Sequence, residues 1–142
     1  MRNLTFLLLL LILPSCSKDE SSSASQVTKE LRDTRWRFTE YLVIPDSGEI
    51  VWRCEGYNGY TMKFVGLGNL LEVNTGVTVR EGSWAVYEGA GGNILQIQTP
   101  EVIKDVYQLS GRWLIIEHTE NTLVLEQKIE KFTLKASLIL FN

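Results

Sequence analysis

The chain is poor in the residues that build metal centres, disulfide frameworks and thiol active sites. Its 142 residues include two cysteines, Cys16 and Cys54, and one histidine, His118. His118 and Glu120 fall on one face of an alternating segment, but two ligands do not complete a metal site. We therefore expect no metal, no cofactor and no disulfide framework. A catalytic Cys54 would need His118 as its base, so we expect a buried, inert thiol and no enzyme.

Two further absences restrict the setting in which the protein works. The longest apolar run, Phe6–Leu13, has eight residues, whereas a membrane-spanning helix needs about 20. Basic residues are not in excess, because 14 Lys and Arg stand against 17 Asp and Glu, for a net charge of −3. Nucleic-acid binding depends on clustered positive charge. We therefore expect no nucleic-acid partner and no electrostatic attraction to anionic lipid.

What the chain does have is a leader over residues 1–15. Arg2 precedes the apolar run, as in the charged and hydrophobic regions of a secretory signal. The sequence Leu13-Pro14-Ser15-Cys16 resembles a bacterial lipobox, in which the cysteine is acylated and becomes the mature N-terminus; Pro14 stands where a small residue is usual. The resemblance implies a lipid anchor on Cys16. The alternative is an ordinary signal peptide cut after Ser17, which would remove that cysteine.

Residues 16–30 read as the lipidated cysteine and a flexible tether. Ser17–Gln26 contains a single apolar residue, so it cannot bury enough surface to order itself. Ser17, rather than Asp, after the cysteine favours sorting to the outer membrane in many Gram-negative bacteria. Lys18-Asp19-Glu20 either resembles a surface-export signal or is a solvated linker. We expect a lipid-anchored envelope protein at the outer membrane, on its periplasmic face or at the cell surface.

Residues 31–142 are expected to form one all-β domain. Apolar and polar residues alternate in segments such as Tyr60–Phe64, and turn sequences such as Pro45–Gly48 and Asn58-Gly59 separate these segments. About eight to ten short strands joined by short turns predict a barrel or a sandwich, and sequential hairpins favour an up-and-down antiparallel β-barrel. One short helical turn, Thr28–Asp33, is expected before the first strand.

The segment 99–110 is ambiguous between a strand and a helix. Thr99-Pro100-Glu101 is a helix-start pattern, and Gly111 would be its stop. Val102, Val106 and Tyr107 suit a strand equally well. We favour a strand because the neighbouring segments are strands.

Residues 31–127 resemble the lipocalin-like domains of small bacterial lipoproteins. Three features carry the resemblance: Thr34-Arg35-Trp36 at the start of the first strand, a central Gly82-Ser83-Trp84, and a late Gly111-Arg112-Trp113. Thr34 stands where lipocalins have glycine. The resemblance implies a lipocalin-like, eight-stranded calyx, which either encloses one small ligand or is filled by its own side chains. It implies no particular ligand.

Trp36, Trp84 and Trp113 are the candidate ligand-binding aromatics. Each shares a predicted face with aliphatic residues, a pattern that is more often typical of a core. Glu40 falls on the same predicted face as Trp36. It either points inward, where a buried charge needs a partner or a ligand, or is turned outward by a β-bulge. Glu117 raises the same question.

Two functions therefore remain open. The first is a lipid-anchored binding module for a small apolar or amphipathic molecule. The second is a filled barrel that acts by protein contact, as an accessory subunit at the cell surface. An open lumen with an inward carboxylate would favour the first. A packed lumen with an exposed aromatic patch, around Tyr41, Tyr57 or Trp52, would favour the second.

Overall fold

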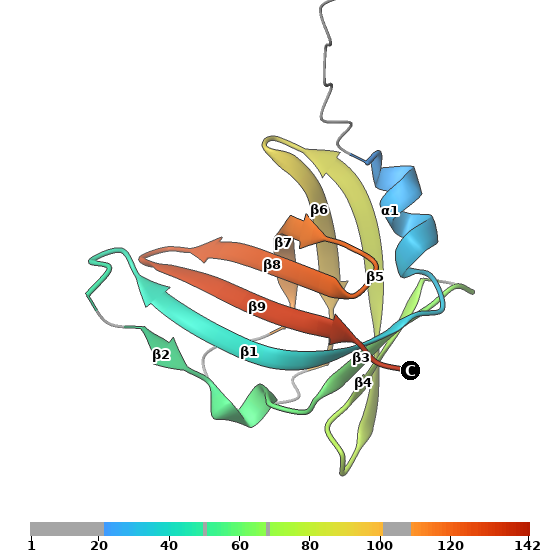
Figure 1. Ribbon diagram of the computed structural model, residues 1–142, viewed down its shortest axis with the longest axis horizontal. Helices are drawn as coiled ribbons and strands as arrows, with labels where there is room; N and C mark the ends of the chain where they lie inside the picture. Colours follow the sequence, from blue (N-terminus) through green and yellow to red (C-terminus); the bar gives the residue numbers. More distant parts are fainter. Residues whose placement is uncertain (1–21, 50, 68, 101–108) are drawn as a thin grey trace, which may run out of the picture.

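Within the described residues, eight antiparallel strands form a closed barrel, with one further short strand at its edge and a short helix before the first strand (Figure 1). The computed structural model describes residues 22–49, 51–67, 69–100 and 109–142. Its elements are α1 (Ala24–Leu31), β1 (Arg35–Pro45), β2 (Trp52–Arg53), the 3₁₀ turn η1 (Glu55–Tyr57), β3 (Thr61–Val65), β4 (Leu70–Asn74), β5 (Val79–Gly89), β6 (Gly92–Gln98), β7 (Gly111–His118), β8 (Thr122–Ile129) and β9 (Phe132–Leu140). The predicted all-β, up-and-down antiparallel barrel is confirmed.

The barrel closes where the last strand, β9, pairs with the first. The register runs from Trp36 opposite Leu140 to Pro45 opposite Phe132, so the two strands pair along almost their whole lengths. On its other edge, β1 pairs first with β3 and then with β2. β2 is thus an addition to a ring of eight strands. Asn58-Gly59, which predicts a hairpin, instead leads from η1 into β3, with Gly59 at a φ of 84°.

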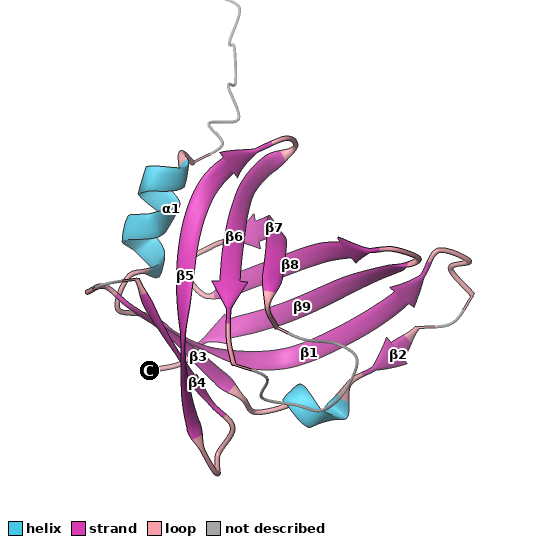
Figure 2. Cartoon of the chain, turned by 180° about the vertical axis from the view of Figure 1, so that it is seen from behind, coloured by secondary structure: helices cyan, strands magenta, loops and turns pink. Residues whose placement is uncertain are grey.

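The helix α1 begins earlier than the helical turn expected at Thr28–Asp33. Its cap is Ser23, whose Oγ accepts a hydrogen bond from the Gln26 N–H at 3.3 Å, as is typical of a helix N-terminus. Val27 and Leu31 lie one turn apart and are buried, so one face of α1 packs on the barrel beside β5 (Figure 2). No helix among the described residues has the length and apolar character to cross a bilayer.

A β-bulge in β1 reverses part of the predicted face assignment. The pairing with β9 shifts between Phe38 and Glu40, and the extra residue moves the alternation of side chains by one position. Tyr41 therefore points inward and is 1% exposed. The expectation that Tyr41 could belong to an exposed aromatic patch is wrong for this reason.

A second bulge has the same effect near the end of β7. The pairing with β8 shifts between Ile115 and Glu117. Glu117 is consequently exposed, whereas the side chain of the next residue, His118, is only 12% exposed. Both bulges thus turn a carboxylate outward and the following side chain inward.

Side chains fill the described part of the barrel interior. The strand and η1 residues that are at most 4% exposed are Trp36, Phe38, Tyr41, Val43, Tyr57, Met62, Phe64, Leu71, Val73, Trp84, Leu95, Ile97, Trp113, Leu123, Leu125, Leu134, Ala136 and Leu138. An eight-stranded barrel is just wide enough to be filled in this way. An open calyx would leave the residues of its wall accessible to solvent. The described interior is therefore a packed core.

The ambiguous segment 99–110 falls mostly outside the described residues, which omit 101–108. Its two described ends are joined by Ser110. The Ser110 Oγ accepts a hydrogen bond from the Thr99 N–H at 2.9 Å and donates one to the Thr99 carbonyl at 3.0 Å. This link fixes the points at which the connection leaves β6 and enters β7.

Candidate functional site

The three candidate tryptophans lie in the core, and each indole N–H already has an acceptor. Trp36, Trp84 and Trp113 are 1%, 3% and 0% exposed. Their Nε1 atoms donate, in the same order, to Thr34 Oγ1 at 2.8 Å, to the Val65 carbonyl at 3.3 Å and to the Leu109 carbonyl at 2.8 Å. A ligand in the lumen would have to displace packed side chains to reach these rings. Trp36 also lines the pocket described below.

The fourth candidate, Glu40, lies on the outside of the barrel. The bulge in β1 turns it away from the lumen, and its Oε1 lies 3.0 Å from Nη1 of Arg53 on β2. Because the Arg53 side chain is 70% exposed, such a pair is expected to contribute at most about 1 kcal/mol to stability. The lumen therefore receives no carboxylate from this position. Cys16, the candidate lipidation site, lies outside the described residues.

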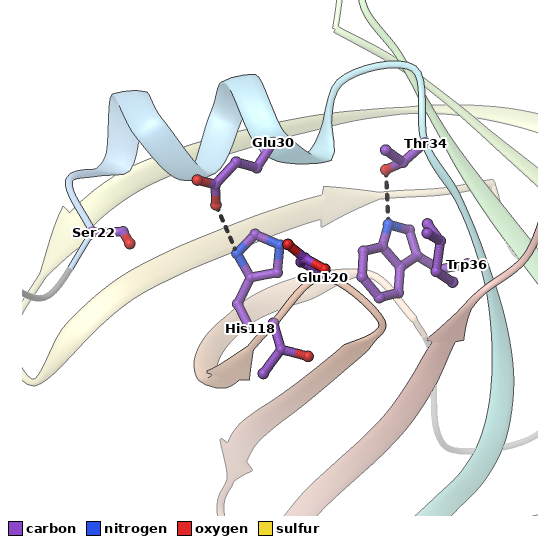
Figure 3. Close-up of a pocket in the computed structure, with 8 residues that line it drawn as sticks. Ser22, Glu30, Thr34, Trp36, His118 and Glu120 are labelled. Carbon is purple, nitrogen blue, oxygen red and sulfur yellow. Dashed lines mark hydrogen bonds and ion pairs between the residues drawn. The ribbon is translucent and has the colours of Figure 1, made fainter.

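A pocket of about 530 Å³ opens between α1 and the adjacent end of the barrel (Figure 3). We call it the helix pocket, and its described lining consists of Ser22, Glu30, Thr34, Trp36, His118, Thr119, Glu120 and Leu140. These residues come from both ends of α1, the start of β1, the β7–β8 turn and the end of β9. The volume falls within the range typical of small-molecule sites.

The helix and the β7 bulge together bring a carboxylate to the histidine. Glu30 lies in the last turn of α1, on a helix held to the barrel by Val27 and Leu31. The bulge turns His118 toward it, and Nδ1 of His118 lies 3.4 Å from Oε2 of Glu30. Figure 3 shows Glu30 pointing down from α1 toward the imidazole, and Glu120 on the other side of the ring.

Thr34 ties the end of α1 to the wall of the pocket. Its hydroxyl donates a hydrogen bond to the Leu31 carbonyl and accepts one from Nε1 of Trp36. The indole of Trp36 lies 6.1 Å from the His118 ring, centroid to centroid, at an interplanar angle of 58°. Thr34 thus holds the tryptophan and the helix in one arrangement.

Burial and a neighbouring carboxylate act on His118 in opposite directions. Burial lowers the pKa of His118 below its ordinary value of 6.5, because the charged imidazolium loses solvent, while the Glu30 carboxylate opposes this by favouring the charged form. Burial is the stronger of the two effects. His118 is therefore neutral at pH 7, and the charge of the helix pocket comes from Glu30 and Glu120.

A second, smaller groove of about 320 Å³ shares a lining residue with the helix pocket. Ser22 lines both, and Glu88 at the end of β5 contributes the carboxylate of the second groove. Nδ2 of Asn93 donates a hydrogen bond to the Ser22 carbonyl at 2.6 Å. This bond fixes the chain that enters α1 against the β5–β6 hairpin, at the end of the barrel where the helix lies.

Sequence reasoning found part of the helix pocket. It placed His118 and Glu120 on one face, and both line the pocket. It missed Glu30, because contact between α1 and the β7–β8 turn depends on barrel closure, which no local pattern reports. Within the described part of the chain, no three His, Cys, Asp or Glu side chains gather closely enough to hold a metal ion.

Comparison with known proteins does not assign a function to this site. The chain matches no protein-family model, no curated protein and no solved structure. The interpretation of the site therefore depends on its own geometry and chemistry.

The lowered pKa of His118 predicts a loss of stability on acidification. In the unfolded chain His118 is protonated near pH 6.5, whereas in the folded chain it is protonated only at lower pH. The free energy of unfolding therefore falls as pH drops below about 6.5. His118→Gln removes this contribution, and it is the only histidine. We expect urea unfolding midpoints to fall more in the native chain than in the variant between about pH 7.5 and about pH 5.5. An equal fall in both, or a smaller one in the native chain, would contradict this.

Proposed function

We propose that the protein is a lipid-anchored envelope protein whose filled barrel acts through protein contacts on its outer surface, as an accessory subunit. The observation that carries the proposal is the packed interior. Trp36, Trp84 and Trp113 are at most 3% exposed, and Glu40 points away from the lumen. A carrier of the lipocalin kind needs an accessible lumen, and the described lumen walls offer none.

An exposed apolar patch lies at the end of the barrel opposite α1. It comprises Val51, Trp52, Ile129 and Phe132, and we call it the distal patch. Val51, Trp52 and Ile129 are 51%, 45% and 37% exposed, and the Trp52 and Phe132 rings lie 6.0 Å apart. In Figure 1, β2 and the β8–β9 turn that carry the patch lie at the left, and α1 lies at the right.

The strand register places the distal patch at the rim of the barrel. Trp52 pairs with Val43, whose side chain is buried in the interior, and directly paired residues point to the same face of a sheet. Trp52 is therefore oriented toward the mouth of the barrel, above the packed core. Exposed tryptophan is enriched among the residues that dominate protein–protein binding energy, so the rim suits a partner that inserts an apolar side chain.

The start of the described chain and the distal patch lie at opposite ends of the barrel (Figure 1). The described chain begins at Ser22, beside α1, and Cys16 precedes it by only six residues. An acyl group on Cys16 would hold the α1 end toward the membrane and direct the distal patch away from it. This arrangement supports a partner in the aqueous phase rather than in the bilayer.

Replacing Cys16 tests the anchor. Cys16→Ser removes the only group to which the acyl chain would be attached, so the protein should move from the detergent phase to the aqueous phase in a phase-separation assay. Cys54→Ser is the matched control and should stay in the detergent phase, because Cys54 lies within the folded domain. A native chain found in the aqueous phase with its N-terminus at Lys18 would show ordinary secretion instead.

Photocrosslinking tests the distal patch. A benzoylphenylalanine at position 52, in the lipidated protein in its own host, should give one discrete protein adduct. The same residue at position 77 is the control, because Val77 is 91% exposed but lies outside the patch. Phe132→Ser should reduce the adduct at position 52 by removing the ring beside Trp52. Equal labelling at both positions, or none at position 52, would contradict a protein partner at this rim.

A further inference from the structure

Among its described lining residues, the helix pocket carries negative charge and no fixed positive charge. Glu30 and Glu120 are the carboxylates among its eight described lining residues, and none of the eight is Lys or Arg. The Glu30 side chain is 41% exposed and Glu120 is exposed as well, so both can be reached from solvent. The pocket therefore favours a cation over an anion.

The rest of the lining suits a cation that carries a short apolar chain. The half-buried Leu140 supplies apolar surface, and Ser22 and Thr119 add hydroxyl groups that can accept hydrogen bonds. The site is a cavity of about 530 Å³ lined by both apolar and acidic residues, which distinguishes it from a cluster of surface carboxylates. A primary ammonium group has three donors, enough to be shared between carboxylate and hydroxyl oxygens.

The pocket also lies close to the start of the described chain. Ser22 lines it and is bonded to Asn93 on the β5–β6 hairpin. Cys16 precedes Ser22 by six positions, and a fully extended chain of that length spans at most about 20 Å. If Cys16 is acylated as proposed, lipid headgroups lie within reach of the pocket.

We infer that the helix pocket binds a primary ammonium group attached to a short alkyl chain. Glu30 and Glu120 hold the ammonium, and Leu140 contacts the methylenes. Two sources share this chemistry: the aminoethyl headgroup of a membrane lipid and a free small amine. The lipid source rests on the proposed anchor, whereas the ammonium site itself does not.

The single histidine of the chain provides a reporter for this site. The imidazole C–H signals of His118 are unique in a proton NMR spectrum, because no other histidine is present. The test titrates n-butylammonium into the processed chain carrying Cys16→Ser, at about pH 8, where His118 is neutral and a primary amine keeps its proton. We expect a saturable shift of the His118 signals, and none with n-butanol, which has the same alkyl chain without the charge.

Charge removal provides the matched comparison. The double variant Glu30→Gln with Glu120→Gln should bind n-butylammonium at least about tenfold more weakly, because two partly exposed carboxylates are lost. Glu81→Gln, an exposed position on β5 outside the pocket, should bind as the native chain does. Circular dichroism checks that each variant keeps the barrel. No saturable shift in the native chain, or an equal shift in the double variant, would overturn the inference.

A vesicle assay separates the two sources. Phosphatidylcholine vesicles with and without phosphatidylethanolamine both present a cationic nitrogen, but only phosphatidylethanolamine has N–H donors. Preferential co-sedimentation with phosphatidylethanolamine, lost in the double variant, would assign the lipid headgroup. Binding of n-butylammonium without that preference would assign a free amine. Failure of acylation or of crosslinking at position 52 would leave the His118 titration unaffected, so the two proposals can fail separately.

Discussion

The pairing of β1 with β9 is the constraint on which the rest of the structure depends. It closes the ring, from Trp36 opposite Leu140 at one end to Pro45 opposite Phe132 at the other. Closure forms an eight-stranded lumen, which can be filled by side chains or hold a small ligand, and here the inward side chains fill it. Both surface features lie at the ends of this pair: Trp36 and Leu140 line the helix pocket, and Phe132 belongs to the distal patch.

The alternation of apolar and polar residues was enough to predict the barrel, because a two-residue period is a local property of each strand. The three buried tryptophans followed from it, and Trp84 and Trp113 lie where the pattern predicts. The inward turn of Tyr41 did not follow, because a bulge depends on how β1 meets β9, far away in the sequence. The place of Glu30 in the pocket could not be predicted for a related reason, because its contact with His118 joins α1 to the end of β7, far away in the sequence.

The two bulges explain how the lumen can be packed although simple alternation places two carboxylates on inward faces. In β1 the bulge turns Glu40 outward to Arg53 and admits Tyr41 to the core. In β7 the bulge exposes Glu117 and turns the following histidine toward α1. Burying a bare carboxylate is costly, so the bulges favour a filled interior. They leave both carboxylates outside the lumen, and the second bulge places the histidine at the end of the barrel. The protein contacts and the ammonium site that we propose are both outside the lumen.

The most direct test of a filled lumen is acrylamide quenching of tryptophan fluorescence in Trp52→Phe. This variant keeps three tryptophans, Trp36, Trp84 and Trp113, and all three belong to the core, whereas Trp52 is 45% exposed. The account predicts blue-shifted emission that acrylamide hardly quenches, with almost all quenching of the native chain due to Trp52. Strong quenching of the variant, or protection that is lost when the protein is extracted with organic solvent, would show an accessible or ligand-filled lumen and contradict it.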